Sequence, residues 1–210
     1  NTTGLAMGDY SAEIVIASND PDEDPRIVPV TLHVGMSSYN ITLSTGWNLV
    51  SLPVIPDNTS IADVTAAINT TIDIIWYYNA NTATWLWYVP GIPVSTLTTI
   101  DDGKGYWFFM NSPAVLEGSG WELPWPGTQP TYDVFEGWNL IGFSSTTSLS
   151  PESYLATIAG TYNPIYGWDA EGQTWLWYVP GNPSSTLTTL EPGYGYWLLA
   201  TADGTIVPPD

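Results

Sequence analysis

Cysteine is absent from all 210 residues of the chain. Its absence excludes disulfide bonds, thiolate metal sites and cysteine nucleophiles. Histidine occurs once, as His33, in a segment whose apolar and polar residues alternate as in a half-buried strand. We expect His33 to be a solvent-facing strand residue and not a catalytic base or a metal ligand.

Cationic side chains are equally scarce, because the sequence contains only Arg26 and Lys104. With 21 acidic residues the formal net charge is −19, and this imbalance comes from missing cations and not from surplus carboxylates. Nucleic acids and anionic lipids need clusters of lysine and arginine, so neither is expected as a partner. No run of about eighteen apolar residues occurs, so this segment is not expected to insert into a membrane. The first residues lack a signal-peptide pattern, and a mature or excised segment would also lack one.

An internal duplication is the most informative feature that is present. Residues 84–107 read TWLWYVPGIPVSTLTTIDDGKGYW, and residues 174–197 read TWLWYVPGNPSSTLTTLEPGYGYW. Eighteen of these twenty-four aligned positions are identical, at an offset of 90 residues. One structural unit therefore occurs twice, which is typical of binding, spacing and assembly modules.

The duplication divides the chain into four segments and predicts a mainly β fold with one short helix per repeat. Residues 1–38 precede the repeats, residues 39–119 form repeat 1, residues 120–129 form a linker, and residues 130–210 form repeat 2. The Gly/Pro/Trp-rich composition of the linker extends over residues 118–131. Each repeat opens with a Gly-Trp-Asn-Leu strand, at Gly46 and at Gly137. A helix, a hairpin and a final pair of strands are expected to follow.

The two helices have different start signals. In repeat 1, residues 60–63 (Ser-Ile-Ala-Asp) fit a variant of the capping box, and Ile61, Val64 and Ile68 would share one face. In repeat 2, Ser150 is the expected N-cap, with a proline at the first helical position. We expect Leu155 to face inward there.

The segments 9–17 and 26–34 alternate apolar and polar residues, and a loop rich in turn formers separates them. This predicts a β-hairpin. From Gly8 to Val34 the pattern resembles the two closing strands of immunoglobulin-like sandwich domains in bacterial and archaeal surface proteins. The resemblance implies an incomplete sandwich. A lone hairpin is marginal in water, so its apolar face should be covered by the repeats, by another chain, or by further strands of a longer protein from which this segment is cut.

Residues 46–110 and 137–200 resemble a small β-rich module of secreted and S-layer-associated proteins of archaea and bacteria. The resemblance rests on the Gly-Trp-Asn-Leu strand, the WYVPG segment and the GYW ending of each repeat. No catalytic residues belong to that module, so the resemblance implies none here. It implies a cell-surface protein.

Carboxylates could catalyse glycoside hydrolysis if two of them stood at a defined separation. The best candidates are Asp101 and Asp102, and their counterpart Glu191, in the turn before each GYW segment. Adjacent residues in a Pro/Gly-rich turn are usually solvated, and Asp102 is replaced by Pro192 in repeat 2. We therefore expect no enzyme and assign no catalytic residue.

Two kinds of surface site remain as candidates. N-x-[ST] sequons favour a glycosylated, extracellular protein; they begin at Asn1, Asn40, Asn58 and Asn69. The acidic loop between the hairpin strands offers oxygen ligands for Ca²⁺, although its spacing does not match a dedicated calcium loop. The weak candidates are Asp20, Asp22 and Asp24, and no other cofactor is expected.

Tryptophan is abundant, with 12 residues, and one strand of each repeat alternates it with leucine and tyrosine. These strands carry Trp85 and Trp87 in repeat 1, and Trp175 and Trp177 in repeat 2. The rings could fill a core, form a partner interface or stack on sugars.

The leading hypothesis is a non-enzymatic structural segment of an extracellular S-layer, stalk or filament protein. It would bind copies of itself, by β-strand addition, or neighbouring surface-protein domains. The alternative is a tandem carbohydrate-binding module that binds polysaccharide.

Overall fold

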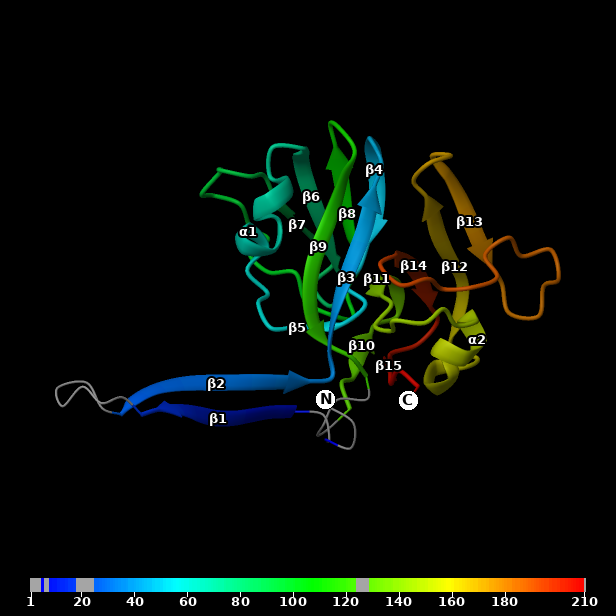
Figure 1. Ribbon diagram of the computed structural model, residues 1–210. Helices are drawn as coiled ribbons and strands as arrows, with labels where there is room; N and C mark the ends of the chain where they lie inside the picture. The colour runs from blue at the N-terminus through cyan, green and yellow to red at the C-terminus, as the bar shows by residue number, and fades with distance from the viewer. Residues whose placement is uncertain (1–4, 6–7, 18–24, 124–128, 210) are drawn as a thin grey trace.

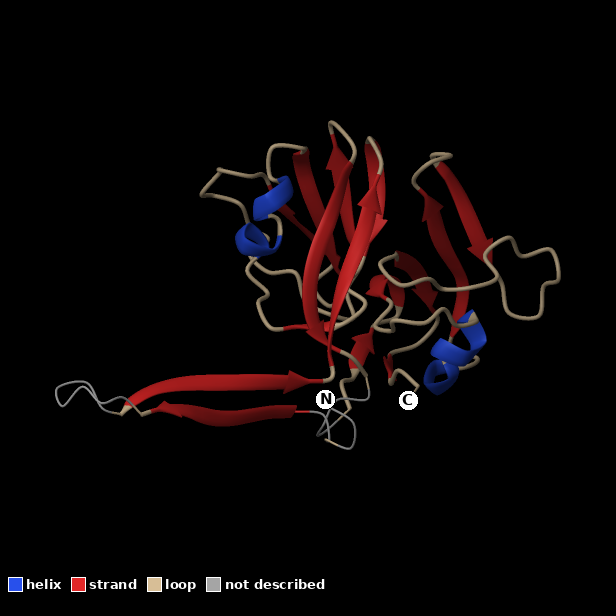
Figure 2. Ribbon diagram, in the orientation of Figure 1, coloured by secondary structure: helices blue, strands red, loops and turns tan. Residues whose placement is uncertain are grey.

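A computed structural model describes residue 5 and residues 8–17, 25–123 and 129–209. The chain is mainly β with one short α-helix in each repeat, which confirms the predicted fold class. Each repeat forms a β module, and a two-stranded ribbon extends from the base of the first module (Figures 1 and 2). In the described part of the chain, no helix combines the length and the apolar character needed to cross a bilayer.

Module 1, residues 36–121, contains two antiparallel sheets. Four strands follow the order β4-β8-β6-β7, and three follow the order β3-β9-β5. The helix α1 and the 3-10 turn η1 connect β5 to β6. The elements are β3 (Met36–Leu43), β4 (Gly46–Val50), β5 (Ile55–Pro56), α1 (Ile61–Val64), η1 (Ala66–Ile68), β6 (Ile72–Asn79), β7 (Thr84–Tyr88), β8 (Tyr106–Met110) and β9 (Ala114–Trp121).

Module 2, residues 132–206, repeats this plan with a smaller second sheet. Its four-stranded sheet has the order β11-β14-β12-β13, which matches module 1 strand for strand, and β10 pairs with β15. The elements are β10 (Tyr132–Val134), β11 (Gly137–Gly142), α2 (Pro151–Tyr154), η2 (Ala156–Ile158), β12 (Tyr162–Asp169), β13 (Thr174–Tyr178), β14 (Gly195–Ala200) and β15 (Gly204–Ile206).

The alternation of side chains along each strand separates a core face from an outer face. In β8, Tyr106, Phe108 and Met110 are buried, whereas Trp107 and Phe109 between them are only partly buried. Successive residues of a strand point to opposite sides of the sheet, so the first three enter the core. The core of module 1 lies between its two sheets, and module 2 has an equivalent core of its own.

The asparagine of the Gly-Trp-Asn-Leu motif is a buried structural residue. In module 1, Asn48 donates from Nδ2 to the carbonyl of Ser44 at 2.7 Å and accepts at Oδ1 from the amide of Ser44 at 2.8 Å. In module 2, Asn139 makes the same pair of bonds to Phe135. A buried amide needs such partners. The motif therefore closes the turn that leads into β4 and β11.

Two predictions from the sequence are corrected here. The final strands of each repeat form but do not pair with each other: β8 pairs with β4 and β6, whereas β9 pairs with β3 and β5. The turn between β8 and β9 passes the chain from one sheet to the other, so neighbours in sequence lie in different layers. The predicted linker begins too early, because β9 continues to Trp121 and residues 118–121 are strand. Residues 124–128 lie outside the described part.

The helix starts differ from each other as the sequence suggested, but only one cap forms as predicted. Ser150 Oγ accepts from the amide of Ser153 at 3.2 Å, and Pro151 occupies the first helical position. Ser60 makes no side-chain capping bond. Asn58 instead fixes the residue that precedes the helix, because its Oδ1 accepts from the amide of Ser60 at 2.9 Å and its Nδ2 donates to Asp63 at 3.1 Å.

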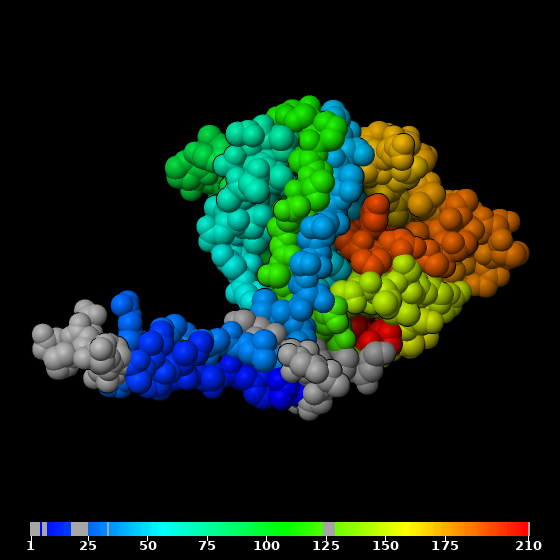
Figure 3. All heavy atoms as spheres, viewed as in Figure 1, coloured from blue at the N-terminus to red at the C-terminus, as the bar shows by residue number. Residues whose placement is uncertain are grey.

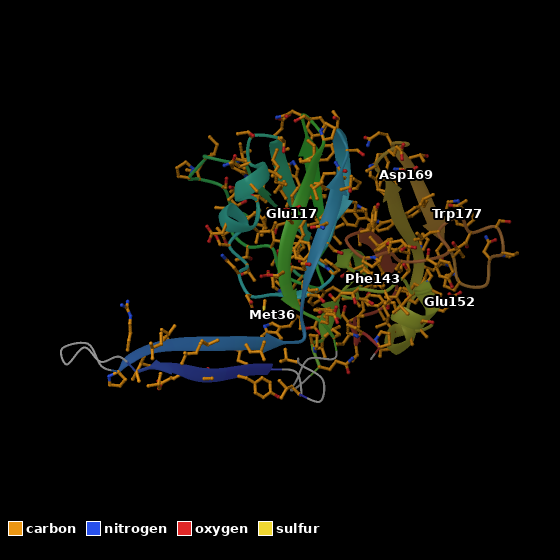
Figure 4. The ribbon with its side chains drawn as sticks, viewed as in Figure 1. Met36, Glu117, Phe143, Glu152, Asp169 and Trp177 are labelled. Atoms are coloured by element: carbon orange, nitrogen blue, oxygen red, sulfur yellow. The ribbon has the colours of Figure 1, made fainter. Side chains whose placement is uncertain are left out.

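The predicted N-terminal hairpin forms as β1 (Gly8–Ile16) and β2 (Arg26–Val34), which pair antiparallel from Gly8 opposite Val34 to Ile16 opposite Arg26. Gly35 follows with φ +94°, a left-handed conformation that favours glycine and turns the chain into β3 at Met36 (Figure 4). The ribbon projects from the body as an arm (Figure 3).

Candidate functional site

The outer faces of the two four-stranded sheets carry eight of the 12 tryptophans and meet at the interface between the modules. In β6, for example, Trp76 and Tyr78 alternate with core-facing Ile75 and Tyr77. We call these surfaces the aromatic faces of modules 1 and 2. They consist of Trp47, Trp76, Tyr78, Trp85, Trp107 and Phe109 in module 1, and of Trp138, Tyr166, Trp168, Trp175 and Trp197 in module 2.

Backbone hydrogen bonds join the modules in a reciprocal pattern. The amide of Ser51 donates to the carbonyl of Gly193 at 3.0 Å, and the equivalent amide of Gly142 donates to Gly103 at 2.9 Å. Isolated β-bridges repeat the exchange, with Val50 opposite Tyr194 and Lys104 opposite Ile141. Such reciprocity is the mark of an isologous interface, normally formed by two copies of one subunit. Here both halves lie in one chain.

Two glycines allow the backbones to approach at the centre of this interface. A Cβ on Gly105 would stand 2.7 Å from the carbonyl oxygen of Ile141, and one on Gly195 would stand 2.9 Å from the Cα of Gly105. Leu49 and Leu140 are buried beside them, although neither belongs to a module core. The glycines of the GYW segments are therefore interface residues as well as turn residues.

The aromatic faces contact each other reciprocally too. Trp107 of module 1 lies against Trp168 and Trp175 of module 2, with ring centroids 5.7 Å away in both cases. Its counterpart Trp197 lies against Tyr78 at 5.6 Å and Trp85 at 5.8 Å. Three of these four pairs are edge-to-face, a favoured geometry for aromatic contacts.

Between the contacts lie two pockets of about 530 and 630 Å³, each lined by six aromatic residues. Each residue that lines pocket 1 has its counterpart, at the equivalent position of the other repeat, in the lining of pocket 2. Trp85 and Trp175 belong to both pockets and form the wall between them. Pocket 1 is lined by Tyr78, Trp85, Trp138, Tyr166, Trp175 and Trp197, and pocket 2 by Trp47, Trp76, Trp85, Trp107, Trp168 and Trp175.

Pocket 2 has an additional clamp that its counterpart lacks. The carbonyl of Trp47 accepts from Trp168 Nε1 at 2.8 Å and from Gln173 Nε2 at 3.0 Å. Gln173 and its counterpart Ala83 have nearly the same backbone φ, +48° and +49°. The methyl group of Ala83 is too short to reach the other module. The two pockets are therefore lined from equivalent positions, but pocket 1 has Tyr78 and Tyr166 where pocket 2 has tryptophans, and the rims differ.

The four tryptophans singled out from the sequence separate into two pairs. Trp85 and Trp175 line both pockets and remain 47% and 46% exposed, so they do not fill a module core. Trp87 and Trp177 are half-buried and line neither pocket; Trp177 lies on β13, at the outer side of module 2 (Figure 4). The other pocket residues were not predicted. Their alternation along β4, β6, β8, β11, β12 and β14 was the available signal.

The carboxylates that were weighed as catalytic have structural partners. Asp101 accepts from Lys104 Nζ at 2.8 Å, and Asp102 accepts from the Tyr132 hydroxyl of module 2 at 2.6 Å. Burial lowers the pKa of Lys104, but its hydrogen bond and charge interaction with Asp101 outweigh burial and raise the pKa. Burial, and then the charge of Asp102, raises the pKa of Tyr132. Glu191 accepts from Thr189 at 2.7 Å and from Ser148.

Three of the four predicted glycosylation residues lie in the described part of the chain. Asn40, Asn58 and Asn69 are all exposed, on β3, before α1 and after η1. Asn1 lies outside the described residues, as do the calcium candidates Asp20, Asp22 and Asp24. Within the described ranges, no group of acidic or histidine residues could hold a metal ion.

Comparison with family models, curated proteins and solved structures finds no match for the chain. The immunoglobulin-like and S-layer-type resemblances therefore stay predictions. Function has to be argued from the surfaces and pockets of this chain, since a fold by itself does not define one.

Proposed function

We propose that this chain is a non-enzymatic structural segment of an extracellular surface protein, of the S-layer, stalk or filament type, and that its hairpin joins it to a second copy. The observation that carries the proposal is the exposed apolar face of the hairpin β1–β2.

One face of the hairpin is apolar except at its outer end, where Arg26 lies opposite Ile16. The register places Ile14 opposite Val28 and Ala12 opposite Val30, all on the same side of the ribbon. Ile14 is 54% exposed and Val30 is 40% exposed. Two strands alone are marginally stable in water, and an exposed apolar strand is a template for pairing with another chain. Covering this face would stabilise the ribbon and join two chains.

The body has cores that do not need the hairpin. Among the described residues, both cores are built from Tyr39 onward, and the module interface ties the two repeats into one unit. The arm is therefore available for a partner. β-Strand addition suits it, because a strand added at an open edge gains main-chain hydrogen bonds and widens the sheet, and the apolar face of that sheet can then pack against a second copy.

An extracellular setting agrees with three exposed sequons and with the shortage of lysine and arginine. Neighbouring surface-protein domains are the other partner that the resemblance implies. Polysaccharide binding through the tryptophans stays a prediction of its own.

The test compares two aspartate variants of β1. Ile14→Asp places a charge on the apolar face, whereas Ser11→Asp places one on the opposite, polar face as the matched control. By light scattering coupled to size exclusion, we expect the unmodified chain and Ser11→Asp to exceed the monomer mass of 22.9 kDa. Ile14→Asp should elute as a monomer. Equal masses for both variants would contradict the proposal.

A further inference from the structure

The two aromatic pockets have a shape and an electrostatic setting that select a class of ligand, independently of assembly. We propose that each pocket binds an organic cation of the quaternary ammonium type, so that one chain binds two. This site goes beyond the proposed assembly role, because no pocket residue lies in the hairpin.

Rings of different orientations line each pocket, which is open to solvent on one side. In pocket 2, Trp107 and Trp175 meet at 82°, and Trp76 and Trp85 meet at 89°. In pocket 1, Trp138 and Trp197 meet at 87°. A rounded, methylated cation can contact several ring faces at once in such a cage. The negative electrostatic potential of each face attracts it, most strongly for tryptophan.

The charge of the chain favours the same class. Lys104 is the only cationic side chain within the two modules, and Asp101 already pairs with it at 2.8 Å. Acidic residues lie close to pocket residues in sequence, with Asp169 next to Trp168 and Glu136 two positions before Trp138. A net charge of −19 raises the local concentration of cations and repels anions.

A neutral sugar fits the lining less well. Sugar hydroxyls that are taken out of water need hydrogen-bond partners, and unmet ones are costly. The linings consist of indole, phenol and little else, and the indole N–H of Trp168 already donates to Trp47. The steep angles between rings also break up the continuous flat platform on which a sugar chain would stack.

Choline and its neutral carbon isostere, in which a tert-butyl group replaces the trimethylammonium group, separate cation recognition from apolar burial. Calorimetric titration of the intact chain should give two choline sites and binding about fivefold tighter than for the isostere, as a cation–π contact at a solvent-open site implies. Tryptophan fluorescence should change in parallel. Equal affinity for the two ligands, or no binding of choline, would overturn the proposal. Binding of a neutral oligosaccharide without choline would also overturn it.

Single-pocket variants locate the sites. Trp138 lines only pocket 1 and Trp47 only pocket 2, and they are 42% and 36% exposed, so either change to alanine should leave the fold intact by circular dichroism. Each variant should bind one choline instead of two. Trp87→Ala, which removes a ring outside both pockets, is the control and should bind two. If Trp138→Ala and Trp47→Ala each still bound two choline molecules, the assignment of one site to each pocket would be contradicted.

Discussion

At the scale of single residues, the glycines of the GYW segments decide whether the modules can meet. Gly105 and Gly195 approach each other so closely that a side chain on either would run into backbone atoms of the other module. From the sequence they look like turn glycines. Nothing local distinguishes a glycine needed for a turn from one needed for a close contact, because the contact partner lies far away in the chain.

A methyl group at this crossing should destabilise the protein. Gly195→Ala would place its Cβ 2.9 Å from the Cα of Gly105 and 3.0 Å from the carbonyl oxygen of Val50. Neither backbone atom can move alone, so we expect a loss of about 1–3 kcal/mol in the free energy of unfolding. Urea denaturation measures it. Ser184→Ala, at an exposed position, serves as control, and an equally small effect in both variants would refute the close contact.

At the scale of elements, the sequence predicted local features far better than pairing. The Gly-Trp-Asn-Leu strands, both helices and the hairpins β6–β7 and β12–β13 follow from period-two alternation, proline and turn residues within a few positions of each other. The strands β3, β5 and β10 were not predicted. The separation of β8 from β9 into different sheets could not be read in this way. The separation depends on which distant strands pair with β8 and with β9. The alternation of apolar and polar residues along a strand is the same whichever sheet the strand joins.

The two serines that begin the helices provide an element-scale prediction. Ser150→Ala removes the bond from the Ser153 amide and should cost about 1 kcal/mol of folding stability. Ser60→Ala, at the equivalent position of repeat 1, should cost clearly less because Ser60 makes no capping bond. Thermal unfolding of the two variants compares them directly. A larger loss for Ser60→Ala would show that the capping box predicted from the sequence forms after all.

At the scale of the whole molecule, both cores bury tyrosine hydroxyls, which makes the fold sensitive to alkali. Burial raises the pKa of Tyr154 to about 12, although its oxygen accepts a hydrogen bond from Ser144. Burial also raises the pKa of Tyr106 and of its counterpart Tyr196, whose oxygens accept from the amides of Asp101 and Glu191.

Because these pKa values are higher when folded than the value of about 10 in an unfolded chain, folding favours the neutral tyrosines. Their contribution is complete below about pH 10 and falls as the pH rises toward the folded pKa, by about 1.4 kcal/mol per unit and per tyrosine. We expect cooperative unfolding between about pH 10 and 12, with tyrosinate absorbance and loss of circular dichroism rising together. Gradual ionisation of all tyrosines in a folded chain would contradict this.

The candidate site also belongs to the whole molecule, which is why the sequence disclosed only part of it. Alternation showed that β7 and β13 carry aromatic rings on both faces, and it singled out Trp85 and Trp175, which line both pockets in the folded chain. It could not show that the outer rings of one repeat face those of the other. An outer aromatic face has the same pattern whether it meets a second module, a sugar or another chain, and only the folded arrangement distinguishes these cases.

The central claim is that the hairpin joins copies of this chain, and sedimentation of the intact protein over a wide concentration range tests it most directly. We predict a species heavier than 22.9 kDa that dissociates reversibly on dilution, since an exposed apolar ribbon gains stability when a second copy covers it. A single species of 22.9 kDa at every concentration would contradict the claim.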